Sequence, residues 1–138
     1  MKIGEWDTLG RARQLLQRQL GDLAAREIAA HVSVNADTGR LRILVATDLG
    51  LLDYAYAPAG NDPEGPWALR GQLYRWASVR GLRLQTDAQI DESTEVARSV
   101  WRLVAEEPKI ELAAGSDQPE REVLAVLALA RACLIGTE

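Results

Sequence analysis

The sequence predicts an α+β fold: a bent antiparallel sheet, or partly open β-barrel, of about six to seven strands, with an N-terminal helix and a capping C-terminal helix. Three segments support this prediction. Residues 1–25 space their apolar side chains as a helix does, residues 27–115 alternate apolar and polar side chains between turn formers, and residues 118–135 form a second, more apolar helical pattern. At 138 residues the chain is about one domain long, so a single domain is expected over residues 1–138.

The composition narrows the functional classes. Hydrophobic residues make up 47% of the chain and charged residues 26%, as in an ordinary compact domain. The formal net charge of −4 disfavours nucleic acid as a partner. Cys133 is the only cysteine, so no internal disulfide and no thiolate metal cluster can form, and no metal or other cofactor is expected. Without a leader pattern or a membrane-spanning apolar run, the sequence predicts a cytoplasmic protein.

The first helix is predicted to begin at a cap formed by Asp7 and Thr8 and to end or fray near Gly21. Its apolar side chains fall on one stripe, which is typical of a surface helix docked on the rest of the domain. A helix lying on a membrane surface is the alternative, because Trp6 and several arginines accompany the stripe. The stripe consists of Leu9, Ala12, Leu16, Leu20 and Leu23.

A three-strand antiparallel meander is expected next, with its centre in the segment from Arg40 to Pro58. Two alternating runs there flank Asp48-Leu49-Gly50, which is a hairpin pattern. The preceding alternating run is joined to them by the turn formers of residues 35–39. His31 lies on the outer face of that run, where a lone histidine is expected to be solvated and not to bind a metal. One face is formed by Ile28, Ala30, Val32, Val34, Leu41, Ile43, Val45, Thr47, Leu52, Tyr54 and Tyr56.

Residues 58–66 are rich in proline and glycine and predict an exposed loop. In the following segment the alternation changes parity at Gly81, as a bulge or tight turn requires. One parity, with Leu69, Leu73, Ala77 and Val79, is interpreted as inward. The other parity forms the outward set, which consists of Arg70, Tyr74, Trp76 and Arg80, joined by Arg83 beyond the glycine.

Residues 96–104 fit a helix or a strand, and a strand is favoured in their second half because Glu106-Glu107-Pro108 then turns the chain into another short strand. The last helix is predicted to be capped by Asp117 or Gln118 and stopped by Gly136. Its broad apolar surface implies cover on more than one side, from the first helix or from a second copy of the protein. The stripe contains Val123, Val126, Leu127, Ala130, Cys133 and Leu134, and a buried, unreactive thiol is expected at Cys133.

This order of elements resembles the pleckstrin-homology-like (PH-like) domains of bacteria over roughly residues 27–135, mainly through the hairpin LRILVATDLGLLDYAYAP. The chain departs from better-known members of that family. It has no tryptophan in the C-terminal helix, and its first hairpin loop, NADTG, has no basic cluster of the kind used for phosphoinositides. The resemblance implies a binding or assembly module, without implying a lipid ligand.

The outward set of Arg70, Tyr74, Trp76, Arg80 and Arg83 is the sharpest candidate binding face, because arginine beside aromatic side chains can hold a phosphate, a carboxylate or a peptide. The competing interpretation, which the sequence favours, buries Tyr74 and Trp76 beneath the N-terminal helix with the arginines around them.

Two functional hypotheses remain. The favoured one is a non-catalytic interaction or assembly module with a protein partner or self-association, including a homodimer. The alternative is a small-ligand-binding or enzymatic domain of open-cone type, which predicts a closed-ended cavity containing His31 or Asp53. An enzyme is the less favoured outcome, because the acidic pairs are better explained as turn residues and no nucleophile motif is present.

Overall fold

The computed structural model describes residues 1–138 and shows an α+β fold with seven antiparallel strands, which confirms the predicted class. Its helices are α1 (Ala12–Leu20) and α2 (Glu120–Gly136), with the short 3₁₀ helices η1 (Ile3–Glu5), η2 (Asp7–Leu9), η3 (Gly21–Arg26) and η4 (Trp76–Ser78). Its strands are β1 (Glu27–Val34), β2 (Leu41–Thr47), β3 (Gly50–Pro58), β4 (Trp67–Arg75), β5 (Arg83–Asp91), β6 (Val96–Ala105) and β7 (Ile110–Gly115).

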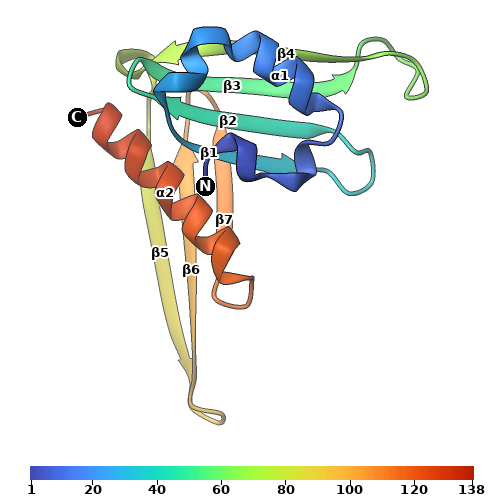
Figure 1. Cartoon of the computed structure of the whole chain (residues 1–138). Helices are drawn as coiled ribbons and strands as arrows, with labels where there is room; N and C mark the ends of the chain where they lie inside the picture. The colour runs from blue at the N-terminus through green and yellow to red at the C-terminus, as the bar shows by residue number, and fades with distance from the viewer.

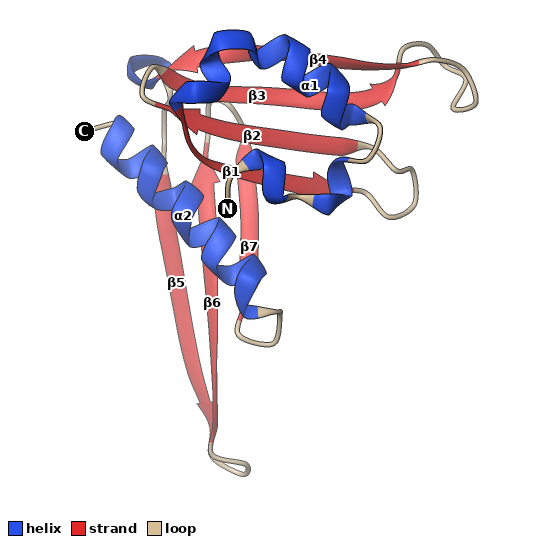
Figure 2. Ribbon diagram, in the orientation of Figure 1, coloured by secondary structure: helices blue, strands red, loops and turns tan.

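The strands form two sheets, where the sequence had predicted one bent sheet. The first has the order β1-β2-β3-β4 and the second β5-β6-β7, and the two do not close into a barrel. Figure 1 and Figure 2 show α1 over one face of the first sheet, while the second sheet runs away from the first with α2 lying across it. The chain changes sheets through η4 and Gly81. Gly81 has a φ of +67°, and a Cβ there would lie 2.6 Å from Cγ of Glu106, so the predicted tight turn depends on glycine.

Two hydrophobic cores lie on opposite faces of the first sheet, and β2 contributes to both. Ile43 and Val45 face the core under α1, whereas Leu44 and Ala46 face the core shared with α2 and the second sheet. The apolar stripe predicted for the first helix packs in the former core, since Leu9, Ala12, Leu16 and Leu20 are all buried there. The alternation read from the sequence therefore identified most of one face correctly, and the opposite face of the central strands is buried as well. Ile28, at an irregularity in the pairing of β1, and Val34, at the end of that strand, were predicted on the apolar face but are each 53% exposed.

Both predicted helix caps are wrong. α1 begins at Ala12, after two short 3₁₀ helices, so Asp7 and Thr8 do not cap it, although it does end before Gly21. α2 begins after Pro119 without a side-chain cap, and the Gln118 side chain instead accepts a hydrogen bond from the Gly115 N–H. No helix in the structure combines the length and the apolar character needed to cross a membrane.

Trp76 and the end of α2 meet through a glycine. A Cβ on Gly136 would lie 2.3 Å from Cε2 of Trp76, so the indole rests directly on the helix backbone. Gly136 is the last residue of α2, so the helix ends within one residue of the predicted stop, and the glycine also makes room for the indole. Tyr74 and Trp76 pack on the core that contains α2, and their predicted cover by the N-terminal helix is wrong.

Replacement of Gly136 by alanine should lower the free energy of unfolding by about 1–2 kcal/mol, because overpacking against the indole outweighs the better helix propensity of alanine. The tryptophan emission should shift as the Trp76 indole is displaced. Gly60→Ala is the matched control, since nothing lies within 4 Å of a Cβ at that position. Equal stability of the two variants in urea unfolding would contradict the packing role of Gly136.

His31 is half-buried against Trp6, where the sequence had predicted a solvated side chain. The two rings meet edge to face, with centroids 5.1 Å apart and an interplanar angle of 65°. Burial lowers the pKa of His31 from its ordinary value of 6.5 to about 4. The neutral imidazole therefore belongs to the packing of the N-terminal segment on β1.

The depressed pKa of His31 predicts a pH-dependent component of stability. Between pH 6.5 and 4 the unfolded chain binds the His31 proton and the folded chain does not, so acidification favours unfolding. The free energy of unfolding should fall by about 2–3 kcal/mol over this range through His31 alone.

His31→Gln should remove that component, seen as a smaller difference between urea unfolding at pH 7 and at pH 4.5. Because carboxylates titrate in both proteins, only the difference between wild type and variant is diagnostic. Identical pH profiles would show that His31 does not titrate in this way.

Candidate interaction surfaces

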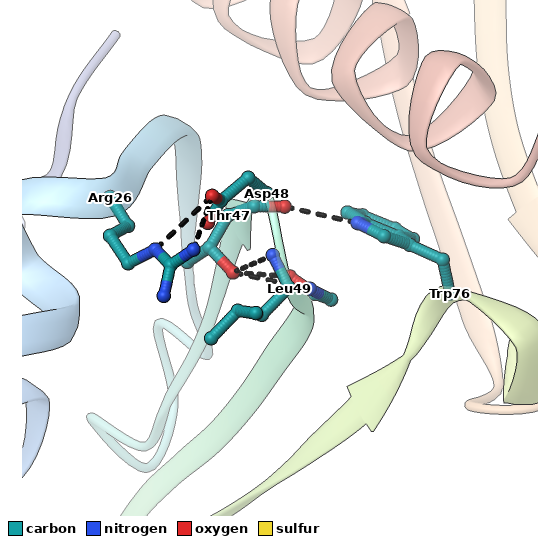
Figure 3. Close-up of polar contacts among 6 residues, drawn as sticks. Arg26, Thr47, Asp48, Leu49 and Trp76 are labelled. Carbon is teal, nitrogen blue, oxygen red and sulfur yellow. Dashed lines mark hydrogen bonds and ion pairs between the residues drawn. The ribbon is translucent and has the colours of Figure 1, made fainter.

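The turn between β2 and β3 is built around the buried side chain of Thr47. Its Oγ1 accepts hydrogen bonds from the N–H groups of Leu49 and Gly50, both at 3.2 Å, and donates to the Gly50 carbonyl oxygen at 3.0 Å (Figure 3). A Cβ on Gly50 would lie 2.2 Å from the carbonyl oxygen of Tyr74 on β4. The sequence Thr47-Asp48-Leu49-Gly50 thus closes the hairpin and also lets β4 approach β3.

Two side chains from other elements bind to this turn. The Trp76 indole N–H donates to the carbonyl oxygen of Thr47 at 3.0 Å, and the Arg26 guanidinium pairs with Asp48 at 2.6 Å (Figure 3). The hydrogen bond from Arg26 holds the pKa of the Asp48 carboxyl below its usual value. Because the ion pair is solvent-exposed, it contributes little to stability, whereas the indole hydrogen bond ties η4 to the first sheet.

An open cleft of ≈ 360 Å³ lies beside this turn. Exposed apolar side chains flank it, with Ile28 53% and Ile135 57% exposed. Its lining consists of Ile28, Thr47, Asp48, Trp76, Ala132, Ile135 and Gly136. The cleft joins β1, the β2–β3 turn and the end of α2, so a ligand there would contact both layers of the fold.

Thr47→Val should lower the free energy of unfolding by about 1–3 kcal/mol, because it leaves the buried N–H of Gly50 and the part-buried N–H of Leu49 without their acceptor. Thr47→Ser keeps the hydroxyl and should retain most of the stability. Chemical denaturation of both variants distinguishes the hydrogen bonds from the lost methyl packing. Similar losses in the two variants would contradict the assigned role of the hydroxyl.

The five residues of the predicted binding face lie on different parts of the molecule. Arg70 and Tyr74 share one face of β4, and Trp76 belongs to the turn just described. Arg80 lies in the connection between the sheets, where its backbone pairs with Glu107, and Arg83 begins β5. The structure therefore does not gather the five side chains into one surface, and a binding role for them stays a prediction.

Arg70 lines a shallow, open hollow on the first sheet. The neighbouring Asp53 accepts two hydrogen bonds from Arg42, at 3.1 and 2.9 Å. The Arg70 guanidinium has no hydrogen-bond or ion-pair partner. The hollow is lined by Asp53, Ala55, Arg70, Gly71 and Gln72. An anion could bind Arg70, but the Asp53 carboxylate in the same hollow would oppose it.

The second sheet contains an arm, which we define as the hairpin of Ala88–Asp91 and Val96–Ser99. β7 pairs with β6 only from Val100 onward. Ser99, at the base of the arm, donates its N–H to the Ser116 hydroxyl and accepts from the Ser116 N–H, and the rest of the arm is a two-stranded ribbon without a third strand. Figure 1 and Figure 2 show it extending beyond α2 and the first sheet. Its side chains are largely exposed, including Ile90 at 71% and Val96 at 50%. At its tip, the Asp91 carboxylate accepts hydrogen bonds from the backbone N–H and the hydroxyl of Ser93.

The arm was not predicted from the sequence, because most of residues 86–95, TDAQIDESTE, are polar. Thr86, Ala88 and Ile90 do alternate with Asp87 and Gln89, and a turn follows at residues 92–95. That weak alternation was the only pattern in the sequence from which the strand of the arm could have been predicted. The segment 96–104, which fitted either element, is strand throughout as β6.

Comparison with known proteins adds no assignment: no protein-family model, no curated protein and no solved structure matches the chain. In the structure no group of three or more His, Cys, Asp or Glu side chains is placed to hold a metal ion. Burial raises the pKa of the Cys133 thiol to about 12, so this cysteine is neutral and enclosed in the core.

Proposed function

We propose that the protein is a non-catalytic interaction module of PH-like architecture, and that the arm and the rest of β5 form its contact element. The observation that supports this proposal is the unsupported ribbon itself. A two-stranded hairpin is only marginally stable alone in water, and an additional strand or a packed surface stabilises it. A folded domain that extends such a ribbon therefore offers an element that gains order on contact.

The open edge of β5 adds to this argument. β5 is the terminal strand of its sheet, and its backbone makes no hydrogen bonds outside the ladder with β6 from Arg83 to Ile90. An exposed strand edge pairs with another strand through its backbone groups. The length of β5, nine residues, is enough for a specific register.

The element order supports the PH-like part of the proposal: a four-stranded sheet, a three-stranded sheet and a C-terminal helix against both. The alternative, a small-ligand-binding domain, has weaker support. His31 packs on Trp6, and Asp53 is paired with Arg42 at a hollow that is open, whereas that hypothesis predicted a closed-ended cavity.

Amide hydrogen exchange tests the contact element directly. The purified protein should exchange rapidly over Ala88–Asp91 and Val96–Arg98. Those amides should gain protection when the labelled protein is placed in extract of the cells that make it, or when its own concentration is raised. Amides of β2, which is buried on both faces, are the internal control and should not change. Unchanged exchange of the arm under both conditions would contradict the proposal.

A further inference from the structure

We propose that the partner of β5 is a second copy of this chain, bound edge to edge through an antiparallel β5–β5 pair centred on Asp87. This proposal rests on the proposed function of the arm and identifies the partner that binds the edge of β5. The two second sheets would then join into one continuous sheet with the strand order β7-β6-β5-β5-β6-β7.

Only half of β5 lies in a three-stranded part of its sheet. Residues 83–87 of β5 pair with residues 100–104 of β6, which β7 covers on the other side, so this half of β5 lies in a three-stranded sheet. Residues 88–91 lie in the two-stranded arm. A two-fold axis at Asp87 places residues 88–91 of each copy against residues 83–86 of the other. Each unsupported half therefore gains the supported half of its partner as a third strand.

This register brings complementary side chains of the two copies together. On one face, Arg83 of each copy lies opposite Asp91 of the other, and Gln85 lies opposite Gln89. On the other face, Leu84 lies opposite Ile90, which is the most exposed large apolar side chain of the protein at 71%. Opposite charges and apolar pairs at facing positions stabilise an antiparallel pair. All nine residues of β5 find a partner only in this register.

One facing pair in this register is unfavourable. Asp87 meets its own copy at the axis, where like charges repel. Arg102 lies on β6 opposite Gln85, diagonal to Asp87, and shares a surface hollow with it. Each Asp87 thus has a cation of its own chain nearby, and the repulsion limits the affinity without excluding the pair. A weak, reversible dimer follows.

The affinity of the dimer provides one test. Light scattering and sedimentation over a concentration series should show a rise toward twice the chain mass of 15.1 kDa. Asp87→Asn should tighten the dissociation constant by up to about fivefold, and Arg83→Glu should weaken it by about tenfold because two ion pairs become two repulsions. Asp37→Asn, in the exposed β1–β2 loop, is the control and should leave the constant unchanged.

Disulfide trapping tests the register itself. Only position 87 faces its own copy, so Asp87→Cys should form a covalent dimer under mild oxidation, whereas Gln85→Cys and Gln89→Cys alone should not. A mixture of the latter two variants should cross-link. The buried, neutral Cys133 thiol should not interfere. Circular dichroism and thermal unfolding would verify that each variant is folded.

Three outcomes would overturn the inference. The first is a monomer at every concentration, and the second is equal cross-linking of the cysteine variants at positions 85, 87 and 89. The third is that Gln85→Cys cross-links with Asp87→Cys in preference to Gln89→Cys. The first of these need not overturn the proposed function. If the arm gains protection from hydrogen exchange in cell extract while the pure protein stays monomeric, the module has a different protein partner.

Discussion

The arrangement of the whole molecule depends on the closed turn between β2 and β3. Thr47 holds this turn by three hydrogen bonds from a fully buried hydroxyl, and its backbone carbonyl receives the indole N–H of Trp76. Trp76 in turn rests on the backbone of α2 at Gly136. One turn therefore fixes the hairpin, the start of the crossing to the second sheet and the end of the last helix. Each of these contacts needs either a buried hydroxyl or the absence of a side chain.

The double burial of β2 follows from that arrangement. With α1 on one face of the first sheet and α2 with the second sheet on the other, a central strand has no solvent side. The composition of β2 agrees with burial on both faces, because the strand contains four consecutive apolar residues, Ile43, Leu44, Val45 and Ala46. Small side chains at Ala29 and Ala46 let α2 approach. The ion pair of Arg42 with Asp53 on that face lies farther along the strands from the β2–β3 turn.

Much of the fold could be predicted from local patterns, and the failures share one physical origin. The hairpin at Asp48–Gly50, the stripe of α1 and the strand alternation depend on residues that are close in sequence. Local sequence patterns therefore predict them. The roles of Gly50 and Gly136 depend on side chains and backbone more than twenty residues away, at Tyr74 and Trp76. His31 likewise follows the strand alternation, but Trp6 from the N-terminal segment covers it. The five residues of the predicted arginine–aromatic face lie on different elements because η4 and Gly81 turn the chain between Trp76 and Arg83.

The polar character of β5 admits two physical explanations that make opposite statements about its edge. Charged residues on an edge strand commonly prevent pairing with other chains. Charged residues prevent such pairing when they face like charges on the other strand, or when they point into an apolar surface of the other chain. β5 has a positive charge at one end, Arg83, and a negative charge at the other, Asp91. When two copies of the strand pair antiparallel, each Arg83 therefore faces the Asp91 of the other copy. Only Asp87 repels, and it lies at the centre, where a single substitution tunes the affinity. The proposed self-pairing requires opposite charges at equal distances from the midpoint of the strand, as Arg83 and Asp91 are from Asp87, whereas protection of the edge does not require this symmetry.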